Sequence, residues 1–265
     1  MRRPGTVFAV LVMLLLVSSF GGCRHRSRVL TVSAAADLSD AFAEIGQNFT
    51  AETGVKVSFN FGSTGQLAYQ IEQGAPVDLF AAAALGYIEA LEQKGALLPE
   101  SRRIYGVGRL VIWTRSDSSI RIEKLSDLTL EEIKRVAIAN PEHAPYGIAA
   151  RESLEAAGVW NEVQPRLVMA GNVREALRYA ESGDVDAALV ARSLCQPSSG
   201  QGGGSGNCIL VPENLHRPLV QALGTVSNSQ NRDLAERFSS LVTSSRGRAI
   251  LGRYGFAVPP AEKEE

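Results

Sequence analysis

Two patterns of apolar residues alternate along the first part of the chain. Short segments in which apolar residues are continuous or alternate with polar ones predict three strands, at 29–36, 55–61 and 77–82. After each strand, apolar residues recur every three or four positions, and a glycine is placed to end each predicted helix: Gly54, Gly74 and Gly95. Strands that alternate with helices at this interval predict an α/β fold with parallel strands and crossover helices.

The same alternation continues through the second half of the chain. Strands are predicted at 108–114, 135–140, 165–169, 185–191, 208–211 and 219–226. Helices are predicted at 126–134, 147–157 and 172–182, and a long helix near the C-terminus carries Leu234, Phe238, Leu241 and Val242. The elements form two blocks without a low-complexity linker, so two lobes would be joined where strands cross between them.

Residues 1–28 have the composition of a targeting segment. The first three residues include two arginines, and the apolar run at 7–17 is too short to span a bilayer comfortably. Small residues follow, which predicts a secretory signal peptide and therefore export. Cys23, after two glycines, resembles the cysteine of a bacterial lipobox, which would carry lipid. Phe20 departs from the aliphatic residue usual in that motif, and a plain signal peptide is the alternative.

Two further cysteines flank a loop rich in glycine and serine. Cys195 and Cys208 are separated by twelve residues. Export would place them in an oxidising environment, where they could form a disulfide that adds about 3 kcal/mol to the free energy of unfolding. Two free thiols beside a linker are the alternative. The glycines do not form a phosphate-binding loop, because no Gly-Lys-Ser/Thr sequence follows them.

The composition of the 265-residue chain is that of an ordinary globular protein. It is 45% hydrophobic and 21% charged, which excludes a disordered, collagen-like or coiled-coil protein. The net charge is −1, but five of the 27 basic residues lie within the first 28 positions, where no acidic residue occurs. The remaining 22 basic and 28 acidic residues give a net charge of −6. A body with this charge does not attract nucleic acid, and we expect no nucleic-acid partner.

Residues that commonly carry catalysis are few after position 28. This part of the chain has two histidines, His143 and His216, and no His-x-x-x-His, Gly-x-Ser-x-Gly or dinucleotide-binding motif. Glu142 precedes His143, but a turn explains both residues. The sequence therefore predicts a protein that is not an enzyme and needs no cofactor. Arg174, in the first turn of a predicted helix, is expected to reach solvent.

Small and turn-forming residues recur where a predicted strand meets the next helix. Four such junctions occur, at 34–40, 61–66, 140–147 and 170–174. Backbone N–H groups in the first turn of a helix lack partners within the helix, and the helix dipole favours an anion there. Because parallel strands bring these junctions to one edge of a sheet, two lobes could surround a small oxyanion without lysine or arginine. Most capped helices bind nothing, however, and the spacing alone leaves both interpretations open.

Asp37 in the first junction has two possible roles. As an N-cap, its carboxylate would accept a hydrogen bond from the N–H of residue 39 or 40. A carboxylate aimed at a bound anion would instead weaken binding by repulsion. We therefore expect the side chain of Asp37 to cap the helix and only its backbone N–H to face the anion.

Five segments together resemble a known family. They are 33–38, 62–65, Gly-Ala-Pro-Val-Asp-Leu-Phe at 74–80, Asn-Pro-Glu-His-Ala-Pro-Tyr-Gly at 140–147, and 172–177. Their order and spacing resemble those of the periplasmic molybdate-binding proteins of ABC importers over about residues 29–258. The resemblance implies a two-lobed type II periplasmic-binding-protein fold, each lobe a mostly parallel sheet flanked by helices. The implied lobes are 29–108 with 219–260, and 109–218 with the glycine-rich loop 195–208.

The resemblance also implies the ligand and the residues that hold it. In this family neutral donors bind molybdate or tungstate as an intact tetrahedral oxyanion, through its oxygens. The matching positions in this chain are Ala36, Asp37, Ser63, Thr64, Tyr146 and Val173. Thr64 would contribute its hydroxyl and N–H, Tyr146 its phenolic O–H and Val173 its N–H. Two positions depart from the family: Asp37 stands where many members have serine, and Ala191 where some have a tyrosine, which Tyr146 would replace.

The partners and location follow from the same resemblance. It implies an exported monomer that delivers molybdate to an inner-membrane ABC permease and touches the membrane only through a lipid on Cys23. A receptor for another tetrahedral oxyanion such as sulfate is one alternative. A membrane-anchored oxyanion sensor without a transport role is the other. Molybdate and sulfate carry the same charge, so the size of the cavity would have to distinguish them.

Overall fold

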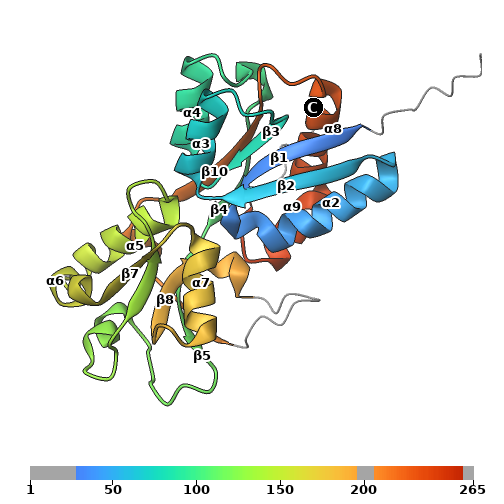
Figure 1. Cartoon of the computed structure of the whole chain (residues 1–265). Coiled ribbons are helices and arrows are strands. Elements are labelled where there is room, and N and C mark those ends of the chain that lie inside the picture. Colours follow the sequence, from blue (N-terminus) through green and yellow to red (C-terminus); the bar gives the residue numbers. More distant parts are fainter. Residues whose placement is uncertain (1–27, 196–205, 259–265) are drawn as a thin grey trace, which may run out of the picture.

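The computed structural model describes residues 28–195 and 206–258, and the chain forms two lobes (Figure 1). Within these residues the strands form two five-stranded sheets, and we call the lobes around them lobe 1 and lobe 2. Cys23, with the predicted signal peptide and lipid anchor, lies outside the described residues, as do most of the glycine-rich loop and the end of the C-terminal tail.

Lobe 1 contains the sheet with strand order β2-β1-β3-β10-β4. Its strands are β1 (Val29–Ala35), β2 (Lys56–Gly62), β3 (Leu79–Ala82), β4 (Arg103–Gly108) and β10 (Leu219–Thr225). Its helices are η1 (Ala36–Leu38), α2 (Ser39–Thr53), α3 (Thr64–Glu72), α4 (Leu85–Gln93), η2 (Pro99–Ser101), α8 (Arg232–Thr243) and α9 (Ser245–Arg253). Helices α3 and α4 cover one face of the sheet, and α2, α8 and α9 cover the other (Figure 1).

Lobe 2 contains the sheet with strand order β7-β6-β8-β5-β9. Its strands are β5 (Leu110–Arg115), β6 (Val136–Ala139), β7 (Leu167–Ala170), β8 (Ala187–Ala191) and β9 (Gly206–Leu210). Its helices are η3 (Leu125–Thr129), α5 (Pro145–Ala156), α6 (Trp160–Val163), η4 (Gln164–Arg166), α7 (Val173–Ser182), η5 (Arg192–Leu194) and η6 (Glu213–Leu215). The α/β class predicted from the sequence is confirmed.

Both sheets are mixed, whereas the sequence predicts mostly parallel sheets. In lobe 1, β1 is parallel to β2 and β3, but β10 is antiparallel to β3 and β4. In lobe 2, β6 is parallel to β7 and β8, but β5 is antiparallel to β8 and β9. The antiparallel strands adjoin the two crossings between the lobes, which run from β4 to β5 and from β9 to β10. A strand that enters a sheet from the other lobe is not delivered by a crossover helix, so its direction is not constrained to be parallel.

The apolar spacing of the sequence corresponds closely to the core. Leu38, Phe42, Ile45 and Phe49, predicted to share one helical face, are all at most 2% exposed. The rings of Phe42 and Phe49 contact Phe238 of α8 edge-on, with centroids 5.7 and 5.4 Å apart. Burial of these side chains therefore fixes α2 and α8 against the same face of the sheet.

The segment at 126–134 is not the predicted helix. Only the short 3-10 helix η3 forms there, and no helix continues to residue 134. The guanidinium of Arg166 donates hydrogen bonds from Nη1 to the backbone oxygens of Thr129, Leu130 and Ile133, at 3.3, 2.8 and 2.7 Å. Arg166, distant in sequence, thus satisfies the carbonyls of Thr129 and Leu130, which a helix to residue 134 would have paired internally.

Two other elements differ from the prediction. Strand β4 was not predicted, because two glycines interrupt its apolar pattern. The long C-terminal helix is divided into α8 and α9 at Ser244, whose hydroxyl accepts a hydrogen bond from Gly247 N–H at 3.1 Å. This serine is an N-cap inside a region of continuous helical spacing.

Cys195 and Cys208 form a disulfide, with their Cα atoms 6.4 Å apart. The bond joins the residue after η5 to strand β9. Among the described residues, no helix is both long and apolar enough to cross a membrane. The same part of the chain contains no group of three or more histidine, cysteine or acidic side chains suited to a metal ion.

Candidate anion-binding site

The four strand-to-helix junctions meet at one pocket between the lobes. In lobe 1, Ala35 at the end of β1 pairs with Gly62 at the end of β2. In lobe 2, Ala139 of β6 pairs with Ala170 of β7 in the same way. The pocket is lined by Ala35, Ala36, Asp37, Gly62, Ser63, Thr64, Ala83, Ala144, Pro145, Tyr146, Asn172 and Val173. All six site residues predicted from the sequence are among them.

The lining of this pocket is neutral apart from Asp37. Within residues 28–195 and 206–258, no lysine, arginine or histidine lines it. The cavity volume of this pocket is about 10 Å³, which is about the room that one water molecule requires. A tetrahedral oxyanion with four oxygens is larger than one water molecule, so the lobes must open to admit it, and the pocket must widen around it when they close again.

Helices from both lobes begin at the pocket. Thr64 is the first residue of α3, and Val173 is the first residue of α7, so their N–H groups have no acceptor within their own helices. Asn172 is the N-cap of α7, and its side chain accepts from Glu175 N–H at 3.0 Å. The Thr64 hydroxyl accepts from Ala83 N–H at 3.1 Å, which leaves its own proton available to a ligand.

The side chain of Asp37 does not cap a helix, and that prediction is wrong. Neither η1 nor α2 has a side-chain cap, and Asp37 is buried, 1% exposed. Its Oδ2 accepts from Gln221 Nε2 at 2.7 Å, while Oδ1 is buried without a hydrogen-bond partner among the described residues. Burial raises the pKa of Asp37 to about 6, and the hydrogen bond from Gln221 partly opposes this shift.

Gln221 joins the residues around Asp37 into one buried network. Its Nε2 also donates to the Tyr146 hydroxyl at 3.2 Å, and its Oε1 accepts from the Tyr105 hydroxyl at 2.9 Å. Burial raises the pKa of both phenols well above their ordinary value, so they remain protonated donors at neutral pH. The sequence did not single out Gln221, although an amide side chain in the middle of the mainly apolar strand β10 was a usable signal.

Hydrogen bonds cross between the lobes beside the pocket. Ser63 Oγ of lobe 1 lies 2.8 Å from the backbone oxygen of His143 in lobe 2 and 2.7 Å from its Nδ1. A hydroxyl with one proton satisfies both contacts by donating to the oxygen and accepting from Nδ1–H. The N–H of Gly65 also donates to the His143 oxygen, at 2.9 Å. The two lobes are therefore in direct contact beside the pocket.

Arg174 does not extend freely into solvent, as the sequence predicted. Its Nη1 lies 2.8 Å from Asp40 Oδ2, which joins α7 of lobe 2 to α2 of lobe 1. The same nitrogen lies 3.4 Å from the hydroxyl of Ser39. This ion pair lies outside the lining of the pocket and holds the lobes together at its side.

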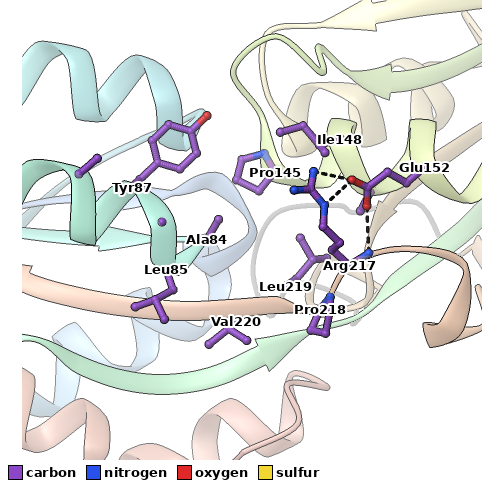
Figure 2. Close-up of a pocket in the computed structure, with 13 residues that line it drawn as sticks. Ala84, Leu85, Tyr87, Pro145, Ile148, Glu152, Arg217, Pro218, Leu219 and Val220 are labelled. Carbon is purple, nitrogen blue, oxygen red and sulfur yellow. Dashed lines mark hydrogen bonds and ion pairs between the residues drawn. The ribbon is translucent and has the colours of Figure 1, made fainter.

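A second, larger cavity of about 510 Å³ lies between the lobes (Figure 2). It is lined mainly by apolar residues of α4, α5 and the start of β10. Its charged side chains, Arg217 and Glu152, point toward each other and form an ion pair at 2.5 Å. A cavity with paired charges and apolar walls is not suited to a small dianion, whereas the smaller pocket offers converging neutral donors.

Comparison with known proteins identifies the family. The family described as bacterial extracellular solute-binding protein matches residues 30–257. The chain belongs to this family. Its members are substrate-binding proteins and not enzymes, in agreement with the sequence prediction.

Three relatives illustrate how far the similarity extends. The molybdate-binding protein ModA of Rhodobacter capsulatus is 30% identical over 254 residues, which cover 96% of each chain. The putative ABC transporter substrate-binding lipoprotein YvgL of Bacillus subtilis is 30% identical over 96% of this chain and 98% of its own. The structure of the periplasmic molybdate-binding protein of Azotobacter vinelandii is 29% identical, with a TM-score of 0.80, over 87% of this chain and all of that one. This solute-binding protein therefore has the type II periplasmic-binding-protein fold.

Proposed function

We propose that this solute-binding protein captures molybdate, and also tungstate, outside the cytoplasm and delivers it to an ABC importer. Relatives named as molybdate-binding proteins cover nearly the whole chain. The observation that carries the proposal is the pocket between the lobes, which both lobes line with hydroxyls and helix N-termini and which no cation lines.

Neutral donors are sufficient to hold a dianion in such a pocket. The N-termini of α3 and α7 supply oriented N–H groups and the positive ends of two helix dipoles. Thr64 and Tyr146 add hydroxyl protons. Because these donors act at contact distance, the negative net charge of the whole chain does not prevent binding.

Binding requires a change in the separation of the lobes. The chain crosses between them from β4 to β5 and from β9 to β10. We propose that these crossings act as the hinge and that the lobes comprise residues 29–108 with 219–260, and 109–218. The position of β10 in the first sheet supports this division. When the lobes close on the ligand, Ser63 and Gly65 would form their contacts with His143.

A thermal-shift panel with the purified protein tests the ligand. Molybdate at 100 times its dissociation constant should add about 2.7 kcal/mol to the free energy of unfolding. For a chain of this size, that corresponds to a rise in Tm of about 5–11 °C. Tungstate should act similarly. Stabilisation by sulfate with none by molybdate or tungstate would reject molybdate and favour the sulfate receptor.

The cellular role needs separate experiments. We propose that Cys23 carries a lipid anchor and that the protein works as a monomer with an inner-membrane permease. The named lipoprotein relative supports the anchor. Deletion of the gene should reduce molybdate accumulation by cells, whereas unchanged accumulation would favour a sensor. Replacement of Cys23 with serine should release the protein from the membrane if the cysteine is lipidated.

The hydroxyl of Thr64 gives a specific prediction at the site. Thr64→Ala should weaken molybdate binding about tenfold, or about 1.4 kcal/mol, because a buried donor to the ligand is lost. Thr64→Ser keeps the hydroxyl and should retain most of the affinity. Thr50→Ala is the control, since its hydroxyl bonds Gly46 O within α2, away from the pocket. Calorimetric titration measures all three variants, and equal affinity of Thr64→Ala and wild type would place the ligand elsewhere.

A further inference from the structure

One carboxylate oxygen of Asp37, a residue that lines the pocket, has no hydrogen-bond partner among the described residues. Asp37 Oδ1 is buried and lacks a hydrogen bond from any described residue, while Oδ2 accepts from Gln221 Nε2. Asp37 lines the same pocket as the hydroxyl donors Thr64 and Tyr146. A buried polar atom without a partner is costly, so its persistence at a ligand pocket points to a partner supplied by the ligand.

A dianion cannot be the partner of an ionised Asp37. An oxyanion without protons offers only acceptors, and an ionised carboxylate also offers only acceptors. The two charges would repel each other strongly at this degree of burial, with no lysine or arginine in the lining to compensate. Only the neutral carboxyl group can make an attractive contact.

We propose that Asp37 binds the oxyanion in its neutral form, taking up one proton from solvent as the ligand binds and donating a hydrogen bond from Oδ1. This inference rests on the proposed function of the pocket as an oxyanion site.

The surroundings of the carboxyl group select the atom that carries the proton. Oδ2 accepts a hydrogen bond from Gln221, which suits the carbonyl oxygen of a neutral carboxyl group, and Oδ1 is left to bear the proton. The Tyr146 hydroxyl accepts from Gln221 Nε2 at 3.2 Å, so its own proton is available to the ligand. Protonation of Asp37 therefore places a second donor beside this phenol.

The other titratable groups around Asp37 do not change this argument. Helices α2, α7 and η5 and strand β2 pack against η1. Helices α2 and α7 bring Asp40 and Arg174, which pair with each other, and α7 also brings Glu175 and Arg178, which pair with each other. Helix η5 brings Arg192, and β2 has Lys56 at its far end. The phenols Tyr105 and Tyr146 stay protonated. His143 of lobe 2 contacts the hydroxyl of Ser63 beside the pocket. His143 is the histidine at this contact, and the experiment must separate its protons from that of Asp37.

The sign of the pH dependence follows from linkage. In the free protein, burial already holds the pKa of Asp37 at about 6, and a bound dianion raises it further. Binding therefore takes up a proton at any pH between these two values, and affinity falls as the pH rises above 6. The dissociation constant of molybdate should rise about tenfold per pH unit, with nearly one proton taken up per ion at pH 7.5.

Calorimetric titration of the protein with molybdate at pH 7.5, in buffers of different ionisation enthalpy, counts the protons. The wild type should take up nearly one proton per ion, and Asp37→Asn should bind with no uptake and little pH dependence. His143→Gln should keep the uptake. If Asp37→Asn does not fold, His143→Gln decides, because loss of the uptake in that variant assigns the proton to histidine and overturns the proposal.

The outcomes distinguish this inference from the proposed function. Tight molybdate binding by the wild type without proton uptake would refute the role of Asp37 and leave the molybdate receptor intact. Absence of molybdate binding at every pH from 6.5 to 8.5 would refute the function itself. Binding of hydrogen phosphate without uptake, in preference to molybdate, would show an ionised Asp37 accepting the ligand's own proton and would also overturn the proposal.

Discussion

Replacing Gly65 with alanine is expected to weaken molybdate binding about ten- to a hundredfold, or by about 1.4–2.8 kcal/mol. A Cβ atom at this position would lie 2.7 Å from the backbone oxygen of His143 and 3.0 Å from its Cβ, across the contact between the lobes. Both His143 atoms belong to lobe 2, just before the start of α5, so relief of these contacts requires the lobes to separate. The Tyr87 hydroxyl of lobe 1 would also lie 3.0 Å away, but it ends a half-buried side chain that can shift. Separation would break the hydrogen bond from Gly65 N–H to the His143 oxygen and move the donors of lobe 2 away from the ligand.

This substitution should not harm the fold of lobe 1. Gly65 is the second residue of α3, where alanine has the higher helix propensity, so the free energy of unfolding without ligand should not fall. Gly86→Ala is the matched control, because Gly86 is the second residue of α4 and a Cβ atom there would contact nothing within 4 Å. Titration with molybdate compares the two variants. Equal affinity of Gly65→Ala, Gly86→Ala and wild type would show that the ligand is not enclosed by this contact.

Reduction of the bond between Cys195 and Cys208 is expected to lower the free energy of unfolding by about 3 kcal/mol. The bond closes a loop of twelve intervening residues, and its loss gives the unfolded chain more conformations. For a chain of this length the expected fall in Tm is about 6–12 °C. Thermal unfolding with and without reductant measures the effect.

A variant with serine at both cysteine positions controls for effects of the reductant elsewhere. It should have the lower Tm and be insensitive to reductant. The disulfide also holds the end of η5, and Ser193 in that helix donates to the backbone oxygen of Asp37 at 2.7 Å. Loss of the disulfide should therefore weaken ligand binding and also lower the free energy of unfolding. Two reactive thiols in the folded, unreduced protein would contradict the prediction.

Local spacing in the sequence was enough to predict most of the elements and their order. Apolar residues at helical intervals placed the buried face of α2, and glycines marked the end of α2 and the turns after α3 and α4. Positive φ angles at Gly54, Gly74 and Gly95 explain why glycine stands there. The prediction was wrong at 126–134, where Arg166 satisfies the backbone from a distance.

The resemblance selected residues that the structure brings into one pocket, but it did not supply their interactions. The expected cap at Asp37 followed from its neighbours in sequence, and the structure instead pairs it with Gln221, 184 residues away. Arg174 was expected in solvent and instead pairs with Asp40, 134 residues away.

The sequence by itself determined the α/β class, the order of strands and helices and the four junctions from which the donors come, because the periodicity of buried side chains and the chemistry of helix ends are local. Only the tertiary structure decided that these junctions share one pocket, that Asp37 is buried with an unpaired oxygen, and that Ser63 and Gly65 meet His143. Those features depend on how the two lobes pack against each other, and the spacing of residues along the chain does not give the distances between residues of different lobes.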